Sequence, residues 1–269
     1  MDMAELNDWT AEYAGLVMGE PDSAVSIVAV DGLVSLPDVR SSDLTLVQQH
    51  GLYPGDDYMN GRTVTLTLEV YGATDEEFAQ ELGRVFAAFT VGGPESPLRF
   101  RFPGLAAGAT AFVNVRPRKR SGPVDLNFAH RVCNVVIELF ATDPHIYADA
   151  VTSRTLSSPW QGSAPKLRFT SPGSVPVRPV ITLDGAQDCV LTDEVTGWYF
   201  GTAGAPGGLT INSEAQRLTE TETGVLVNDK ITPGSVWPEY GFGDHRLTLS
   251  TASTAGPATA VIAWRDRWV

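Results

Sequence analysis

The sequence predicts a mainly β protein with two domains, the first α+β and the second a β-sandwich. Several stretches of the first 147 residues alternate apolar and polar side chains, as strands with one buried face do. Only one stretch has the apolar spacing of a helix. After Tyr147 the chain becomes a series of short apolar runs separated by Gly, Asp and Pro, which is typical of an all-β domain.

The predicted strands of the first domain are 24–32, 63–72, 98–102, 110–115 and 131–140. Residues 63–72 place four aliphatic side chains on one face and three threonines with Glu69 on the other. In 98–102 the alternation turns Arg99 and Arg101 outward. The last strand ends before Asp143-Pro144, because proline lacks an amide donor and disfavours regular structure in the residue before it.

One helix is predicted over residues 75–90. Thr74 is its N-cap, and Glu77 completes a capping box. Gly92-Gly93-Pro94 ends it. The side chains at helical spacing predict one buried stripe that packs on the strands: Phe78, Leu82, Val85, Phe86 and Phe89. The first domain is therefore a β-barrel-like sheet with one helix.

The predicted domain boundaries are 1–147 for the first domain, 148–165 for a linker and 166–269 for the sandwich. The Ser- and Pro-rich residues 153–165 are consistent with a linker or with an edge extension of the second domain. Strands of the sandwich are expected within 175–185, 197–202, 208–212, 245–250 and 258–264. Cys133 and Cys189 lie far apart and are expected to be small core residues, without a disulfide or a zinc site.

The formal net charge is −13, and most of it lies at the start of the chain. Residues 1–60 hold eleven Asp and Glu against the single Arg40. Such a surface repels nucleic acid, although solubility alone also explains it. No apolar run is long enough for a membrane span, and the polar N-terminus does not resemble a signal peptide, so we expect a soluble protein.

No motif for catalysis or for a cofactor is present. The four histidines are scattered without metal-ligand spacing, and no Walker, dinucleotide, zinc-protease or Gly-x-Ser-x-Gly pattern occurs. The glycine-rich stretches 204–208 and 240–244 are predicted to be turns. The sequence therefore predicts a protein that is not an enzyme and has no catalytic residues, no metal site and no cofactor.

Two features point to binding. The basic run 116–120 is too short for a nucleic-acid motif beside so acidic a chain, and it fits a hairpin tip that contacts an acidic neighbour: Arg116, Arg118, Lys119 and Arg120. The second half is rich in aromatic residues, most of which should be core, above all Trp264. Exposed members could stack on sugar rings, and the candidates are Trp198 and Trp237.

Five stretches occur in an order that resembles a known family: "WTAEYAGLVMG", "LPDVRSSD", "HGLYPGDDYMNGRTVTLTLEVYG", "RPRKR" and "FATDPHIY". They are similar to the distal tail protein (Dit) family of siphophages, in the form of the minor tail proteins of actinobacterial phages. The likeness covers about residues 9–147. The second domain is similar only in outline, to the galectin-like or carbohydrate-binding sandwiches of that family.

The resemblance implies a structural protein of the virion, at the distal end of the phage tail. Such proteins form a hexameric ring that contacts the tail tube protein on one face and the tail-tip hub, or a tail-associated lysin, on the other. Double-stranded DNA passes through the ring without specific binding, and an acidic wall avoids adhesion to phosphate. Asp56 and Asp57 are the channel-lining candidates. The alternative is a carbohydrate-binding module that adheres to a host-surface glycan, and a cell-wall hydrolase is least favoured.

Overall fold

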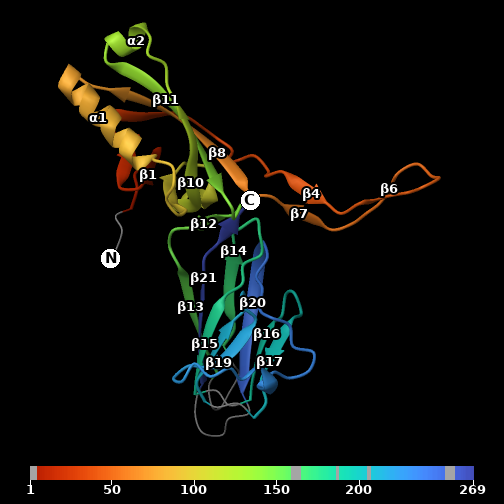
Figure 1. Cartoon of the computed structure of the whole chain (residues 1–269). Helices are drawn as coiled ribbons and strands as arrows, with labels where there is room; N and C mark the ends of the chain where they lie inside the picture. Colours follow the sequence, from red (N-terminus) through yellow and green to blue (C-terminus); the bar gives the residue numbers. More distant parts are fainter. Residues whose placement is uncertain (1–4, 159–164, 186–187, 205–206, 252–257) are drawn as a thin grey trace. The chain divides into compact units, whose positions relative to one another are not determined.

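A computed structural model describes residues 5–158, 165–185, 188–204, 207–251 and 258–269. The chain forms two compact units, one comprising the residues up to Asp149 together with Val269 and the other Ala150–Trp268. Most described residues in regular structure are in strands, as predicted (Figure 1). Within the described residues, no helix is long and apolar enough to cross a membrane.

Antiparallel strands build the first unit, in the order β2-β1-β9-β10-β11-β8-β3. Their bounds are β1 (Thr10–Tyr13), β2 (Leu16–Met18), β3 (Val25–Asp31), β8 (Arg62–Tyr71), β9 (Ser96–Arg101), β10 (Ala111–Ser121) and β11 (Val132–Ala141). A further strand, β12 (Ile146–Ala148), pairs with β10. The longest pairing joins β8 to β11 from Arg62↔Ala141 to Tyr71↔Val132. Both strands alternate as predicted, and their aliphatic faces form the core.

The predicted helix is α1 (Asp75–Ala88), and its capping box between Thr74 and Glu77 is present. Phe78, Val85 and Phe89 are buried, but the predicted stripe is too wide. Leu82 is only half-buried and Phe86 is 38% exposed, because the sheet covers a narrower face of the helix than the apolar spacing suggests. A short second helix, α2 (Leu126–Ala129), was not predicted; Asp125 caps it with bonds from Asn127 and Phe128.

Arg99 does not point outward as the alternation predicts. Its side chain is buried, with Nη1 2.6 Å from Glu12 Oε2 and Nη2 2.7 Å from Asp149 Oδ2. The paired strand β1 supplies Glu12, and Asp149 follows β12. A single-strand pattern cannot reveal these carboxylates, which turn a nominally exposed position into a buried ion pair. Arg101 remains partly exposed and contacts Glu5 and Asp8.

The second unit is the predicted β-sandwich. One sheet has the order β13-β21-β15-β18-β19 and the other β14-β20-β16-β17. The strands of the first sheet are β13 (Thr152–Ser158), β15 (Val180–Asp184), β18 (Leu209–Asn212), β19 (Arg217–Glu220) and β21 (Ala258–Trp264). Those of the second are β14 (Leu167–Ser171), β16 (Cys189–Asp193), β17 (Tyr199–Gly201) and β20 (Gly243–Thr251). Both sheets contribute to one apolar core, which includes Trp264 and Cys189 as predicted.

Part of the predicted linker is a strand. Thr152–Ser158 form β13, which pairs along its whole length with β21 at the edge of the first sheet. The edge extension that the sequence also allowed is therefore what this segment forms, since Leu156 reaches the core while its neighbours stay polar. Residues 159–164 of the predicted linker lie outside the described residues.

Candidate assembly surfaces

A long β-hairpin arm leaves the first unit between β3 and β8. We call residues 34–60 the arm. Its base pairs β4 (Val39–Ser41) with β7 (Asp57–Met59), and its outer part pairs β5 (Leu44–Thr45) with β6 (Leu52–Tyr53). Figure 1 shows it reaching away from the sheet of its own unit. No prediction from the strand pattern anticipated it, because its strands are very short.

The outer part of the arm exposes apolar side chains that have no core beneath them. Leu44 is 66% exposed, Val47 85% and Tyr53 64%. In the pairing Leu44↔Tyr53 and Thr45↔Leu52, apolar residues occur on both faces of the hairpin. A lone two-stranded hairpin is marginally stable in water, so such a segment gains most by covering another surface.

Arg62 fixes the root of the arm. It is almost fully buried; its Nε donates to Pro144 O at 2.7 Å, and its Nη1 donates to the carbonyls of Gly32, Leu33 and Ser35. Burial lowers the pKa of Arg62. Gly32 has a φ of 88°, and a Cβ there would lie 2.0 Å from Thr63 O, so only glycine fits this turn. The guanidinium thus binds the chain just before the arm to the corner that follows β11.

Asp56 and Asp57, the predicted channel-lining residues, lie at the base of the arm. The Asp56 carbonyl accepts from the Ser42 amide, the Asp56 amide donates to Ser42 Oγ, and Asp57 lies opposite Ser41 in the β4–β7 pair. Both carboxylates are exposed. Nearby, bonds donated by the Gly55 amide and by Ser41 lower the pKa of Asp43. The channel-lining role itself stays a prediction.

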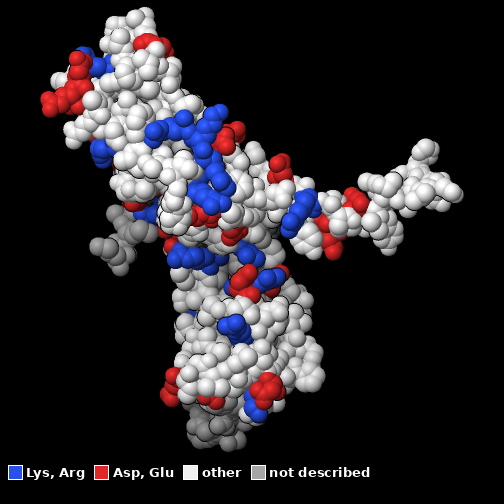
Figure 2. All heavy atoms as spheres, viewed as in Figure 1, with Lys and Arg blue, Asp and Glu red and all other residues white. Residues whose placement is uncertain are grey.

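The basic run is not a hairpin tip, as the sequence suggested, but part of strand β10. Its residues pair with β11 from Arg116↔Phe140 to Ser121↔Val136, with a bulge between Pro117 and Lys119. Proline at a strand edge or bulge was the available signal, because it cannot donate to a central ladder. Figure 2 shows Lys and Arg atoms gathered over the β10–β11 part of this unit.

The structure does not bring all four basic residues onto one surface. Arg120 crosses to the helix, where its guanidinium lies 3.9 Å from the centre of the Phe86 ring and donates to Phe86 O at 2.8 Å. Arg118 lies 5.2 Å from the centre of the Phe140 ring. Lys119 is opposite Glu138, and Arg116 is 3.9 Å from Glu95. We call the segment Arg116–Lys119, in which Arg118 and Lys119 are exposed, the basic edge.

Strand β3 and the far part of strand β10 each have an edge without a partner strand among the described residues. In the order β10-β11-β8-β3, strand β3 pairs only with β8. At the other side, β9 covers β10 only as far as Val115, so the stretch from Arg116 to Ser121 has β11 on one side alone. Unpaired edges expose amide and carbonyl groups that can pair with another chain, and basic side chains on an edge restrain unwanted pairing.

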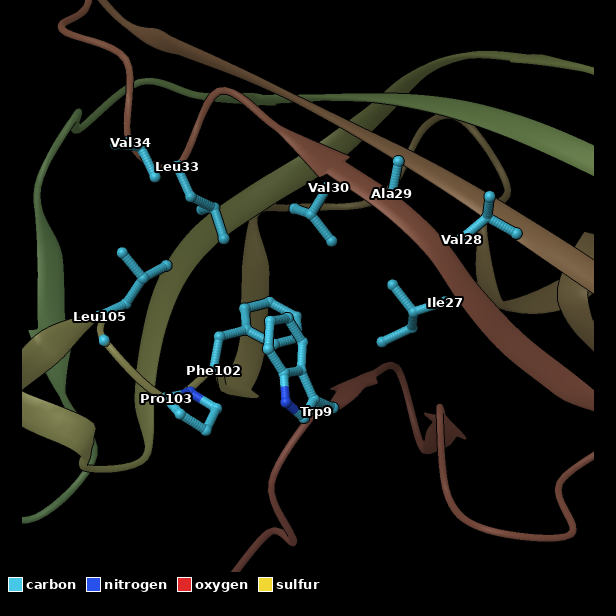
Figure 3. A pocket seen from close by; sticks show the side chains of 11 residues that line it. Trp9, Ile27, Val28, Ala29, Val30, Leu33, Val34, Phe102, Pro103 and Leu105 are labelled. Carbon is cyan, nitrogen blue, oxygen red and sulfur yellow. The ribbon is translucent and has the colours of Figure 1, made fainter.

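An apolar groove of about 440 Å³ lies beside the open edge of β3 (Figure 3). Trp9, 64% exposed, and Phe102 form one side of it, and Val28 and Val30 of β3 form another. Val34, at the start of the arm, completes the lining. An exposed tryptophan in an apolar groove is typical of a protein-binding surface.

The two sugar-stacking candidates pack against the core of the second unit. Trp198 is half-buried, with its ring centre 6.0 Å from that of Tyr240, and Trp237 lies 5.1 Å from Phe200. Phe242, which sequence reasoning did not single out from the other aromatic residues, is 78% exposed. Sugar binding by Trp198 and Trp237 stays a prediction.

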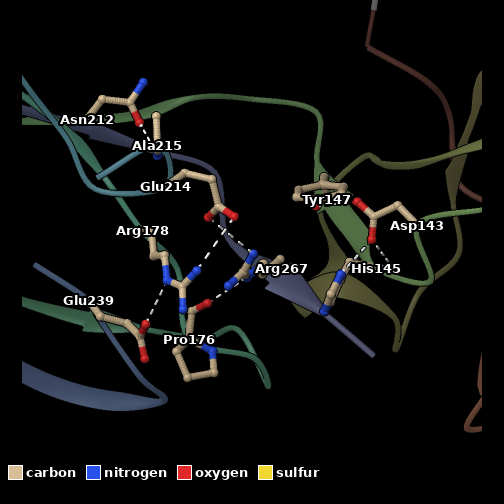
Figure 4. A network of polar contacts seen from close by, with 10 residues as sticks. All are labelled: Asp143, His145, Tyr147, Pro176, Arg178, Asn212, Glu214, Ala215, Glu239 and Arg267. Carbon is tan, nitrogen blue, oxygen red and sulfur yellow. Dashed lines mark hydrogen bonds and ion pairs between the residues drawn. The ribbon is translucent and has the colours of Figure 1, made fainter. Parts of the chain in front are cut away.

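Each unit contains a cluster of polar contacts (Figure 4). In the first unit, Asp143 accepts from Tyr147 Oη at 2.6 Å and lies 2.6 Å from His145 Nδ1. Burial acts to raise the pKa of Asp143, but these bonds lower it to about 2. In the second unit, Arg178 contacts Glu239 and Glu214, and Arg267 donates to Pro176 O.

The second unit also buries a histidine–carboxylate pair. His245 Nδ1 is 2.7 Å from Asp193 Oδ2, and its Nε2 is 2.9 Å from Gly241 O. Burial acts to raise the pKa of Asp193, and bonds from His245, Val195, Arg246 and Thr196 lower it. Aromatic rings pack against His245, so the pair lies within the core. Across the described residues, no group of three or more His, Cys, Asp or Glu is placed to hold a metal ion.

The fold of this chain, a helix on a long-stranded sheet followed by a β-sandwich, is similar to that of a phage distal tail (Dit) protein. The particular match is the crystal structure of the SPP1 Dit (gp 19.1) protein, described as a paradigm of the hub adsorption apparatus in phages that infect Gram-positive bacteria. It aligns with a TM-score of 0.66 over 97% of this chain and 99% of that one, at 12% sequence identity. The predicted Dit fold is confirmed.

Two structures of the phage P2 baseplate in its activated conformation, with Ca and with Sr, match less well. Their TM-scores are 0.41 and 0.38, with 10% identity over 90% of this chain and 91% of each of theirs. These two likenesses add no argument. No family model matches the sequence, and no curated protein matches it.

Proposed function

We propose that this chain is a structural protein of a siphophage tail tip. Copies form a hexameric ring at the distal end of the tail, which joins the tail tube to the tail-tip hub or to a tail-associated lysin. The observation that carries the proposal is the arm, whose exposed apolar residues lack a core within their own chain. The Dit fold supports the position in the virion.

The surfaces of the first unit favour a closed ring over a two-fold dimer. The arm and the groove beside Trp9 differ from each other in shape, and the open edges belong to two different strands, β3 and β10. Contacts between unlike surfaces of identical copies are heterologous, and they close into a ring when the rotation between copies allows it. The order of six comes from the family resemblance.

A ring at this position continues the DNA channel. Its wall must not bind phosphate strongly, because each Lys or Arg contact releases counterions and retains the polymer. The acidity of the first sixty residues agrees with that need. Asp56 and Asp57 are the residues of this acidic stretch that are candidates to face the channel.

The proposal is tested by the mass of the full-length protein in solution. Light scattering coupled to size exclusion should give a mass near six times that of one chain. The matched variant replaces residues 42–56 with a short Gly-Ser turn, which leaves the rest of the unit intact, and should give mostly monomer. A wild-type protein that stays monomeric at every concentration, even with tail tube protein added, would contradict the proposal.

A further inference from the structure

The base of the arm carries exposed acidic side chains. We call the β4–β7 pair with its flanking residues, 38–43 and 55–60, the stem. Asp38, Asp56 and Asp57 have no side-chain hydrogen bond or ion pair within the part of the chain that the structure describes. The only basic residue of the stem, Arg40, lies over the Tyr58 ring at 5.7 Å. In Figure 2 the outer part of the arm is white and acidic atoms gather along its base.

The basic edge carries the opposite charge. Arg118 and Lys119 are exposed, and neither forms an ion pair within 4.0 Å among the described residues. The contact of Arg116 with Glu95 is long, at 3.9 Å. The bulge between Pro117 and Lys119 and the missing partner strand leave this segment open to another molecule.

The root of the arm and the basic edge lie at the same level along the strands but on different strands of the sheet. Arg116 pairs with Phe140, and Phe140 with Thr63, one residue beyond the root at Arg62. The arm departs next to β3, whereas the basic edge is in β10, two strands beyond β8 in the order β10-β11-β8-β3. The two charged surfaces are therefore separated within one copy, and copies set side by side bring them together.

We propose that the acidic stem of one copy docks on the basic edge of the next copy. This inference rests on the proposed ring and names the contact that orients it. The acidic stem attracts the basic edge. A contact between two stems, or between two basic edges, brings like charges together and is unfavourable. The charges therefore favour head-to-tail assembly. Asp56 and Asp57 then face a neighbouring subunit and not the genome.

The experiment uses charge reversal in the full-length protein. One variant is D56K/D57K, and the other is R118E/K119E. The matched control is D184K/E222K, which makes the same change of net charge as D56K/D57K at exposed positions of the second unit. Each interface variant alone should assemble with a dissociation constant roughly ten- to a hundredfold weaker than that of wild type, and the deficit should shrink as salt is raised. The control should assemble as wild type does.

Mixing the two variants is the decisive experiment. In a 1:1 mixture, the reversed, basic stem of D56K/D57K can dock on the reversed, acidic edge of R118E/K119E. The unchanged acidic stem of R118E/K119E can dock on the unchanged basic edge of D56K/D57K. Rings in which the two variants alternate should therefore form at wild-type mass. This recovery also shows that both variants are folded. If wild type and both variants form rings at the same protein concentration, the docking inference is wrong, but the proposed ring is not contradicted. If the variants fail and their mixture also fails, the inference is likewise overturned. A wild type that forms no ring contradicts the proposed function itself.

Discussion

At the scale of single residues, Arg62 has the largest effect on the arm. Its buried guanidinium binds the carbonyls of Gly32 and Leu33 before the arm, of Ser35 at the start of the arm, and of Pro144 after β11. Replacing it with Met leaves those acceptors unpaired, and we expect a loss of roughly 2–4 kcal/mol in the free energy of unfolding. Urea denaturation measures the loss, and hydrogen exchange should rise first at residues 33–35.

The matched variant is Arg62→Lys, which keeps the charge but cannot reach several carbonyls with one planar group. It should recover only part of the stability. If lysine restored the full free energy of unfolding, the positive charge would account for the stabilisation and the several hydrogen bonds of the guanidinium would not.

Asp143 predicts a dependence on pH. Its carboxylate is stabilised by Tyr147 and His145 at the corner after β11, and its pKa falls from 3.8 to about 2 in the folded protein. A depressed pKa contributes stability above the unfolded value of 3.8, and this contribution is lost as the pH falls toward 2. Asp143→Asn should therefore destabilise the protein at pH 7, with a difference from wild type that shrinks below pH 3.8.

Thermal unfolding of both proteins across this range checks the expectation. Asp184→Asn is the control, because its exposed carboxylate has no side-chain partner among the described residues and lies outside the proposed interface. A difference between Asp143→Asn and wild type that stays constant down to pH 2 would rule out the carboxylate as its source.

At the scale of elements, the arm makes the sharpest prediction. Leu44, Val47 and Leu52 are exposed, so changing them to Ser removes no core contact and should leave the melting temperature of the isolated chain nearly unchanged. If their apolar surface covers a neighbouring copy, the same triple variant should lose assembly, measured as the fraction of oligomer by light scattering. Unchanged assembly would exclude the apolar outer part of the arm from the interface.

The regular elements were predictable because their signals are local. The capping box at Thr74 and the alternation of β8 and β11 depend on neighbours a few residues away in sequence. Arg99 was predicted wrongly, since Glu12 and Asp149, which bury it, are distant in sequence. The arm was not predicted because its own chain buries neither of its faces, so its sequence has no sustained alternation of apolar and polar side chains.

The sequence identified the charged residues of the candidate surfaces but not their positions in the fold. Acidic Asp56 and Asp57 and the basic run 116–120 were identified from the sequence, yet their positions at a hairpin base and on a strand edge depend on tertiary pairing. Pro117 was a missed indication of the edge. For Trp198 and Trp237, composition could not separate a core ring from an exposed one.

At the scale of the whole molecule, one account joins these observations. The chain has the Dit fold, its first unit leaves an apolar arm, a groove and two strand edges without partners among the described residues, and its charges are segregated between arm and edge. A single copy leaves all of these surfaces in water. In the proposed ring, neighbouring copies cover them.

The most direct test is electron microscopy of the purified full-length protein at assembling concentration. The account predicts class averages of a ring with six-fold symmetry and a central opening wide enough for double-stranded DNA. Particles without an opening, or a population of single chains alone, would contradict it.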